Sequence, residues 1–177
     1  MWNDSQCNEF LAMSPTEQVN AIIRMVQLTY APQAWRSWSE KWLSGKDRSS
    51  ESTRLDIKAS PWVANTLIAA RCLAWSLDAE DDAAKYWRQH KDTAPEPPVD
   101  FDDGNVIANK FYDDKMESDI NGAYAVGREA YAKWWADVVG HYTINTVDYI
   151  TRNNLVGADQ IQLCIKDALG QEAFNAE

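Results

Sequence analysis

The sequence contains few of the residues that build the commonest small catalytic and metal sites. Its seven glycines stand singly along 177 residues, which argues against a glycine-rich phosphate-binding loop. The two histidines, His90 and His141, have no second ligand three or four residues away, and the three cysteines are too widely spaced for a zinc site or a disulfide framework. No serine or cysteine stands in a recognisable nucleophile motif. We therefore expect no metal, no cofactor and no catalytic residues.

Long apolar runs are also absent. The most apolar stretch, residues 62–77, is interrupted by Arg71 and is too short to cross a bilayer. The first ten residues have neither a basic start nor an apolar segment, so they do not resemble a secretory signal. Because unpaired thiols are typical of a reducing compartment, we expect a soluble protein in the cytoplasm of a bacterial host cell, without a membrane role.

The sequence also lacks the extended alternation of apolar and polar residues that indicates a β-strand. Its apolar residues instead recur at the spacing of three to four residues that is typical of helices. Ser14-Pro15-Thr16-Glu17 is a capping-box pattern, and Pro32 and Pro61 also stand where helices can begin. Gly45, Gly140 and Gly170 follow periodic stretches, as C-terminal caps do. Helices are expected over about residues 15–30, 35–45, 50–59, 61–77, 79–91, 105–123, 144–153 and 158–169, and residues 124–142 continue the pattern of 105–123, either as a ninth helix or beyond a bend near Gly122 or Gly127.

These patterns predict an all-α protein, in which residues 1–177 form a single-domain bundle of about eight or nine helices. Residues 61–77 are apolar nearly all round, which marks a central buried helix. An acidic, proline-rich loop over residues 92–105 joins the two halves of the domain. Trp35, Trp38 and Trp42 share one helical stripe, so we expect them in the core.

Negative charge is concentrated in one part of the chain. The net charge is −10, and residues 92–120 hold nine acidic residues against two lysines, whereas the remainder holds 18 acidic and 15 basic residues. Such a field repels phosphate backbones and attracts basic proteins, so direct nucleic-acid binding is not expected. Aromatic residues are interleaved with the acids here, which suits an interface better than a solubility patch. The predicted partner-binding residues are Asp100, Phe101, Asp102, Asp103, Asp113, Asp114, Glu117 and Asp119.

Other interpretations of the carboxylates are weaker. A calcium loop numbered from Asp100 would need a turn glycine at its sixth position and a bidentate glutamate at its twelfth. In this chain Gly104 falls at the fifth position and Phe111 at the twelfth, so both requirements fail. The pairs Asp81-Asp82, Asp102-Asp103 and Asp113-Asp114 stand in polar surroundings, whereas acid–base catalysis needs a carboxyl group with a shifted pKa. In addition, Asp81 and Asp82 would lie in the first turn of the helix expected over 79–91, where acids favour the helix dipole.

A resemblance covers about residues 34–88. The segment AWRSWSEKWLSGKDRSSEST, with the W-L-S-G-x-D-R-S turn at Trp42 to Ser49, resembles small helical alanine- and tryptophan-rich proteins of the phage-accessory or bacterial immunity type. The turn is structural and has no catalytic residue to carry over. The resemblance implies a setting of conflict between phage and bacterium.

Together these features favour a binding protein, and not an enzyme. The leading hypothesis is an acidic inhibitor, encoded by a phage or mobile element, that blocks a basic nucleic-acid-handling target in an anti-defence role or neutralises a toxin. One alternative is a structural or accessory protein that self-associates through exposed tryptophans. Another is a divalent-metal-dependent enzyme that uses the paired carboxylates. The oligomeric state is left open by the sequence.

Overall fold

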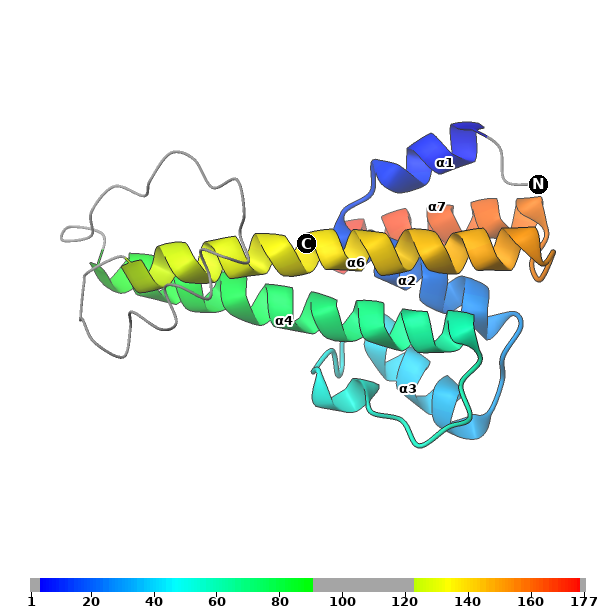
Figure 1. Cartoon of the computed structure of the whole chain (residues 1–177), viewed down its shortest axis with the longest axis horizontal. Coiled ribbons are helices and arrows are strands. Elements are labelled where there is room, and N and C mark those ends of the chain that lie inside the picture. The colour runs from blue at the N-terminus through cyan, green and yellow to red at the C-terminus, as the bar shows by residue number, and fades with distance from the viewer. Residues whose placement is uncertain (1–3, 91–122, 176–177) are drawn as a thin grey trace. The chain divides into compact units, whose positions relative to one another are not determined.

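The protein is all-helical wherever the structure, a computed structural model, describes it, namely over residues 4–90 and 123–175 (Figure 1). These residues form six α-helices and one 3₁₀ turn, and no strand occurs among them. The bounds are α1 Asp4–Leu11, α2 Pro15–Gln27, α3 Gln33–Leu43, the turn η1 Glu51–Thr53, α4 Pro61–His90, α6 Ala123–Arg152 and α7 Ala158–Asn175. The all-α prediction is therefore confirmed, whereas the prediction of eight or nine helices is not matched.

Two pairs of expected helices are in fact single helices. Residues 61–77 and 79–90 belong to α4, because no glycine or proline interrupts the chain between them, and Lys91 lies outside the described residues. Residues 124–142 and 144–152 belong to α6, which continues through Gly140 and ends one residue before the predicted limit at 153. A glycine inside a helix costs about 1 kcal/mol relative to alanine, which tertiary packing readily outweighs. Gly140 and Gly170 are thus helical and not caps, whereas Gly45 has the positive φ of 73° that a helix C-terminus uses.

The chain divides into two compact units, which are described separately. Unit 1 comprises residues 1–73 and 138–177, and unit 2 comprises residues 74–137. Both boundaries fall inside helices, so α4 and α6 each contribute one segment to each unit. The predicted loop over residues 92–105 lies outside the described residues.

Unit 1 is organised around α2, which contacts both α3 and α7 (Figure 1). Eight of its 13 residues are buried, among them Val19, Ile22, Ile23 and Val26, whose spacing places them on one apolar stripe of the helix. Ser14 starts the helix as expected, since its hydroxyl accepts a hydrogen bond from the Glu17 N–H and its own N–H donates to the Glu17 carboxylate. The core of this unit therefore follows from the apolar periodicity of the sequence.

The tryptophans of α3 complete that core. Trp35 and Trp42 are fully buried and Trp38 nearly so, which confirms the core assignment of this stripe. The ring centroids of Trp35 and Trp38 are 5.0 Å apart, and those of Trp38 and Trp42 are 5.6 Å apart. At these separations tilted aromatic pairs contribute about 0.5–1.5 kcal/mol beyond their buried area. None of the seven tryptophans whose side chains the structure describes is among its exposed large hydrophobic residues.

A buried glutamine connects three segments of unit 1. Gln18 Nε2 donates to the carbonyl oxygens of Phe10 and Met13, at 3.3 and 3.2 Å, and so caps the end of α1. Its Oε1 accepts a hydrogen bond of 2.9 Å from Thr143 Oγ1 on α6. Gln18 is only 7% exposed, so its amide loses its hydration on folding, and these three hydrogen bonds replace the lost contacts with water.

In unit 2 the described segments of α4 and α6 run antiparallel. As residue numbers rise along α4, the residues contacted on α6 have falling numbers. Trp75 packs on Trp135, Ser76 Oγ donates to the Ala132 carbonyl at 2.8 Å, and Asp82 binds Arg128. The buried residues among the described part of unit 2 are mostly alanines, whose small side chains allow close approach of the two backbones. They are Ala74, Ala79, Ala83, Ala125, Ala130 and Ala132.

Candidate functional site

The residues predicted to bind a partner lie outside the part of the chain that the structure describes. They are Asp100, Phe101, Asp102, Asp103, Asp113, Asp114, Glu117 and Asp119. By sequence they stand between α4 and α6, and therefore within unit 2. Their role as a binding surface stays a prediction, and the candidate site is built below from described residues of the same unit.

The two units differ sharply in charge. By sequence, unit 2 holds 15 acidic and 7 basic residues, a net charge of −8 out of the −10 of the whole chain. Unit 1 holds the other 12 acidic and 10 basic residues and is nearly neutral, at −2. The acidic residues 92–120 stand by sequence between the two described segments of unit 2, and these segments hold six more acidic residues.

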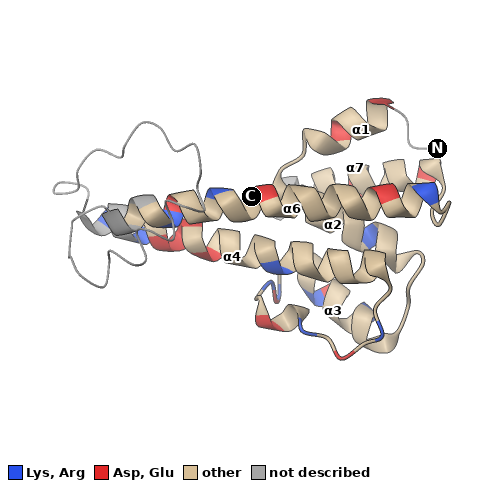
Figure 2. Cartoon of the chain, in the orientation of Figure 1, with Lys and Arg blue, Asp and Glu red and all other residues tan. Residues whose placement is uncertain are grey.

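On α4 all the acidic residues lie in the half that belongs to unit 2 (Figure 2). They are Asp78, Glu80, Asp81 and Asp82. The Lys85 ammonium binds the Asp81 carboxylate one helical turn away, and this hydrogen bond lowers the pKa of Asp81. A general acid needs a raised pKa, so the shift of Asp81 is in the direction opposite to the one that acid catalysis requires. Both residues lie within α4, not in the first turn of a separate helix as predicted.

Four aromatic rings of unit 2 form a continuous cluster. The centroids of Trp75 and Trp135 are 4.6 Å apart, and those of Trp134 and Trp135 are 4.5 Å apart. Tyr131 packs edge-on against Trp135 at 5.7 Å and lies 6.1 Å from Trp134. All four rings are half-buried, so each keeps some contact with solvent. Two helices from distant parts of the sequence thus present one aromatic surface.

Carboxylates border this aromatic cluster at helical spacing. Asp78 follows Trp75 by three residues on α4, and Asp137 follows Trp134 by three residues on α6, so each shares a helix face with its ring. Both carboxylates are exposed, and neither forms an ion pair with another described residue. We call this surface the indole–carboxylate face, formed by Trp75, Asp78, Asp82, Tyr131, Trp134, Trp135 and Asp137.

One arginine of the chain lies against the indole–carboxylate face. The Arg128 guanidinium is 2.9 Å from the Asp82 carboxylate and 5.7 Å from the Tyr131 ring centroid. Its side chain is 10% exposed, whereas that of Asp82 is 42% exposed. A guanidinium over an aromatic face beside a carboxylate is the arrangement in which cation–π and ionic attraction act together. The face is therefore chemically suited to guanidinium groups.

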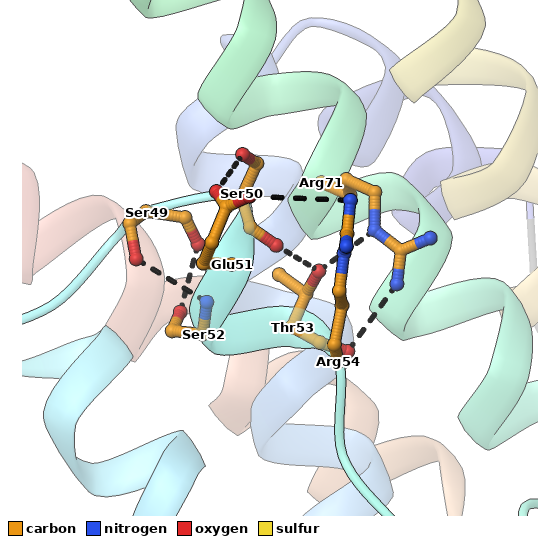
Figure 3. A network of polar contacts seen from close by, with 7 residues as sticks. All are labelled: Ser49, Ser50, Glu51, Ser52, Thr53, Arg54 and Arg71. Atoms are coloured by element: carbon orange, nitrogen blue, oxygen red, sulfur yellow. Dashed lines mark hydrogen bonds and ion pairs between the residues drawn. The ribbon is translucent and has the colours of Figure 1, made fainter.

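A second polar cluster lies in unit 1, where a helix was expected over residues 50–59 (Figure 3). Only Glu51–Thr53 is helical, as the turn η1, because hydroxyl side chains here compete for backbone groups. Ser52 Oγ donates to the Ser49 carbonyl at 2.8 Å, and Thr53 Oγ1 donates to the Ser50 carbonyl at 2.6 Å. The run of hydroxyl residues is the sequence signal that predicts this turn, and the helical prediction was wrong.

Arg71 fixes the cluster to α4. Its Nε donates to Thr53 Oγ1 at 2.9 Å, and its Nη2 lies 3.5 Å from the Thr53 carbonyl oxygen, as Figure 3 shows. Hydrogen bonds from the Ser49 and Ser50 hydroxyls lower the pKa values of Asp47 and Glu51, respectively. The hydroxyls of Ser49, Ser50, Ser52 and Thr53 all form bonds within the cluster. We therefore assign it a structural role.

Metal-binding and membrane-spanning features are missing from the described part of the chain. No group of three or more histidine, cysteine, aspartate or glutamate residues there is arranged to hold a metal ion. No helix among the described residues is sufficiently long and apolar to traverse a membrane. The three cysteines are unpaired; Cys72 and Cys164 are buried in the core, and burial raises the pKa of each thiol to about 11.

Comparison with known proteins does not place the chain in a family. No family model, no curated protein and no solved structure matches it. The function must therefore be inferred from the chemistry of the surfaces described above.

Proposed function

We propose that the protein is a non-enzymatic binding module whose acidic unit 2 engages a basic surface on another protein. The single observation that supports this most strongly is the charge segregation: unit 2 has a net charge of −8, and unit 1 only −2. Self-repulsion of this size destabilises a compact unit, so its concentration in one unit favours a role in attracting a partner. Carboxylates facing lysine or arginine would speed association and provide specificity, while aromatic contacts would supply most of the affinity.

The resemblance of residues 34–88 to phage-accessory and immunity-type proteins supports a narrower version of the proposal. The partner would then be a nucleic-acid-handling protein or a toxin, whose basic groove the acidic residues would occupy in place of a phosphate backbone. The protein would act in the bacterial cytoplasm as an anti-defence inhibitor or a toxin-neutralising protein.

Two charge-reversal variants test the proposal. Asp113→Lys, Asp114→Lys and Glu117→Lys together change the charge of unit 2 by +6. The matched control, Glu40→Lys, Asp56→Lys and Asp167→Lys, makes the same change at exposed positions of unit 1. Proteins captured from host lysate on the wild-type chain would be identified, purified and titrated against all three chains between about 0.05 and 0.3 M salt.

The proposal predicts that the captured protein is basic and that its affinity falls with salt. The unit 2 variant should lose most of this affinity and most of its salt dependence, whereas the unit 1 variant should keep both. Equal binding by the two variants would show that only the net charge matters. Undiminished binding by the unit 2 variant would refute the proposed surface.

The self-association alternative receives less support. The described tryptophans are buried or half-buried, and a symmetric dimer through unit 2 would bring two units of −8 together. Light scattering distinguishes the models, since a clean monomer in dilute solution contradicts self-association. The metal-dependent enzyme makes a separate prediction, namely a rise in melting temperature with Mg²⁺, Mn²⁺ or Ca²⁺.

A further inference from the structure

The indole–carboxylate face repeats one pairing of groups. Trp75 with Asp78, and Trp134 with Asp137, each place a half-buried indole three residues before an exposed carboxylate on the same helix. A related arrangement joins the two helices, where the Arg128 guanidinium of this chain lies over the Tyr131 ring and is paired with the Asp82 carboxylate. In the first two pairs, no described cation forms an ion pair with the carboxylate.

We propose that this face binds arginine side chains of the basic partner, with guanidinium groups stacked on Trp75 and Trp134 and paired with Asp78 and Asp137. The inference rests on the proposed function, because it names the chemistry by which unit 2 recognises a basic surface. Arg128, which lies 5.7 Å from the Tyr131 ring centroid and 2.9 Å from Asp82, is the internal precedent for this mode of contact.

Arginine suits the face better than lysine for two physical reasons. Its guanidinium is planar and weakly hydrated, so it can stack on an indole at a small desolvation cost, whereas a compact ammonium keeps its water more strongly. Its fork of N–H donors can also bind a carboxylate while the plane of the group stays against the ring. The occupant is not a second copy of the chain, since a second unit 2 would add another −8 next to these carboxylates.

The test compares two peptides of equal charge, nonaarginine and nonalysine, titrated calorimetrically against the full-length protein at low salt. Because they have the same charge, the long-range attraction to unit 2 is similar for both, and their difference measures the contribution of guanidinium contacts. We expect nonaarginine to bind about threefold to thirtyfold more tightly, the range that one or two cation–π contacts provide. Equal affinity of the two peptides for the wild-type protein would overturn the inference.

Substitutions locate the preference. Asp78→Asn with Asp137→Asn changes only exposed groups, and Trp134→Leu removes one of the two indoles; each should lower the arginine-to-lysine affinity ratio, and the three substitutions together should lower it further. The matched control is Trp62→Leu, which removes a half-buried indole of unit 1 that stacks on Tyr149 and should leave the ratio unchanged. A ratio that persists in both unit 2 variants would contradict the assignment of this face.

The outcomes also separate this inference from the proposed function. If both peptides bind equally, and the charge reversal at residues 113, 114 and 117 abolishes their binding, the acidic module stands and only the arginine-specific face is wrong. If neither peptide binds the wild-type protein more tightly than the charge-reversal variant, the proposed function itself fails.

Discussion

Replacing Gln18 with leucine should destabilise unit 1 by an amount that the hydrogen-bond geometry sets. The amide of Gln18 has three partners: the carbonyls of Phe10 and Met13 and the hydroxyl of Thr143. Two of these keep another partner when the amide is removed. The Phe10 carbonyl still accepts from the Met13 N–H at 3.2 Å, and the Thr143 hydroxyl still donates to the Gly140 carbonyl at 3.0 Å.

The Met13 carbonyl is therefore the group that loses its side-chain donor. Met13 is 6% exposed, so water replaces that donor poorly. One buried carbonyl without a partner costs about 1–3 kcal/mol, and the apolar surface that leucine buries offsets part of this. We expect Gln18→Leu to lower the free energy of unfolding by about 2 kcal/mol. Gln18→Glu should cost more at neutral pH, because a carboxylate cannot donate to two carbonyls and would bring a buried charge beside them.

Urea denaturation followed by far-ultraviolet circular dichroism measures these changes. The control is Gln162→Leu, which removes one half-buried amide that donates to Glu9 at 2.6 Å and should cost at most about 1 kcal/mol. The predicted order of destabilisation is Gln18→Glu, then Gln18→Leu, then Gln162→Leu. If Gln18→Leu were no less stable than the control, a buried amide would not be what ties the end of α1 to α6.

Two further predictions concern the thiols and the charge of unit 2. At pH 8, iodoacetamide should modify half-buried Cys7 well before Cys72 and Cys164. The pKa values of about 11 leave only about 0.1% of each of the two buried thiols ionised at this pH. Mass spectrometry measures the labelling, and rapid modification of all three cysteines in the native protein would contradict the burial of Cys72 and Cys164. Raising the salt concentration from about 0.01 to 0.3 M should increase the hydrogen-exchange protection of residues 74–90 and 123–137, since salt screens the net charge of −8 in unit 2. The protection of residues 15–27, in unit 1, should hardly change. Lower protection of unit 2 at high salt would refute net self-repulsion.

Local sequence signals predicted the parts of the fold that depend on neighbouring residues. The capping box at Ser14 and Glu17 forms as its residues require, and Gly45 ends α3 with the positive φ expected of a C-terminal glycine. The apolar stripe of α2 and the tryptophans of α3 are buried because their spacing places each set on one helix face. In each case the deciding interaction lies within about one or two helical turns.

The errors arose where distant residues decide the structure. Residues 50–59 do not form a helix because Ser and Thr hydroxyls bind the local backbone and Arg71, far along the chain, binds Thr53. Gly140 does not end a helix because packing of α6 outweighs its weak intrinsic cost. The indole–carboxylate face was likewise beyond sequence reasoning, since it exists only when Trp75 on α4 meets Trp135 on α6.

The charge of unit 2 would be hard to explain as a means of stabilising the fold. Among its described carboxylates, Asp81 and Asp82 are paired with Lys85 and Arg128, and ion pairs with such exposed partners contribute little to stability. The remaining excess of acids opposes compaction, whereas unit 1, with almost balanced charge, builds its stability from a tryptophan-rich core. A net repulsion retained in one unit is relieved when a basic surface binds there, because each new ion pair removes part of it. The same charge that weakens unit 2 alone would thus strengthen its complex, which is why we attribute binding to this unit.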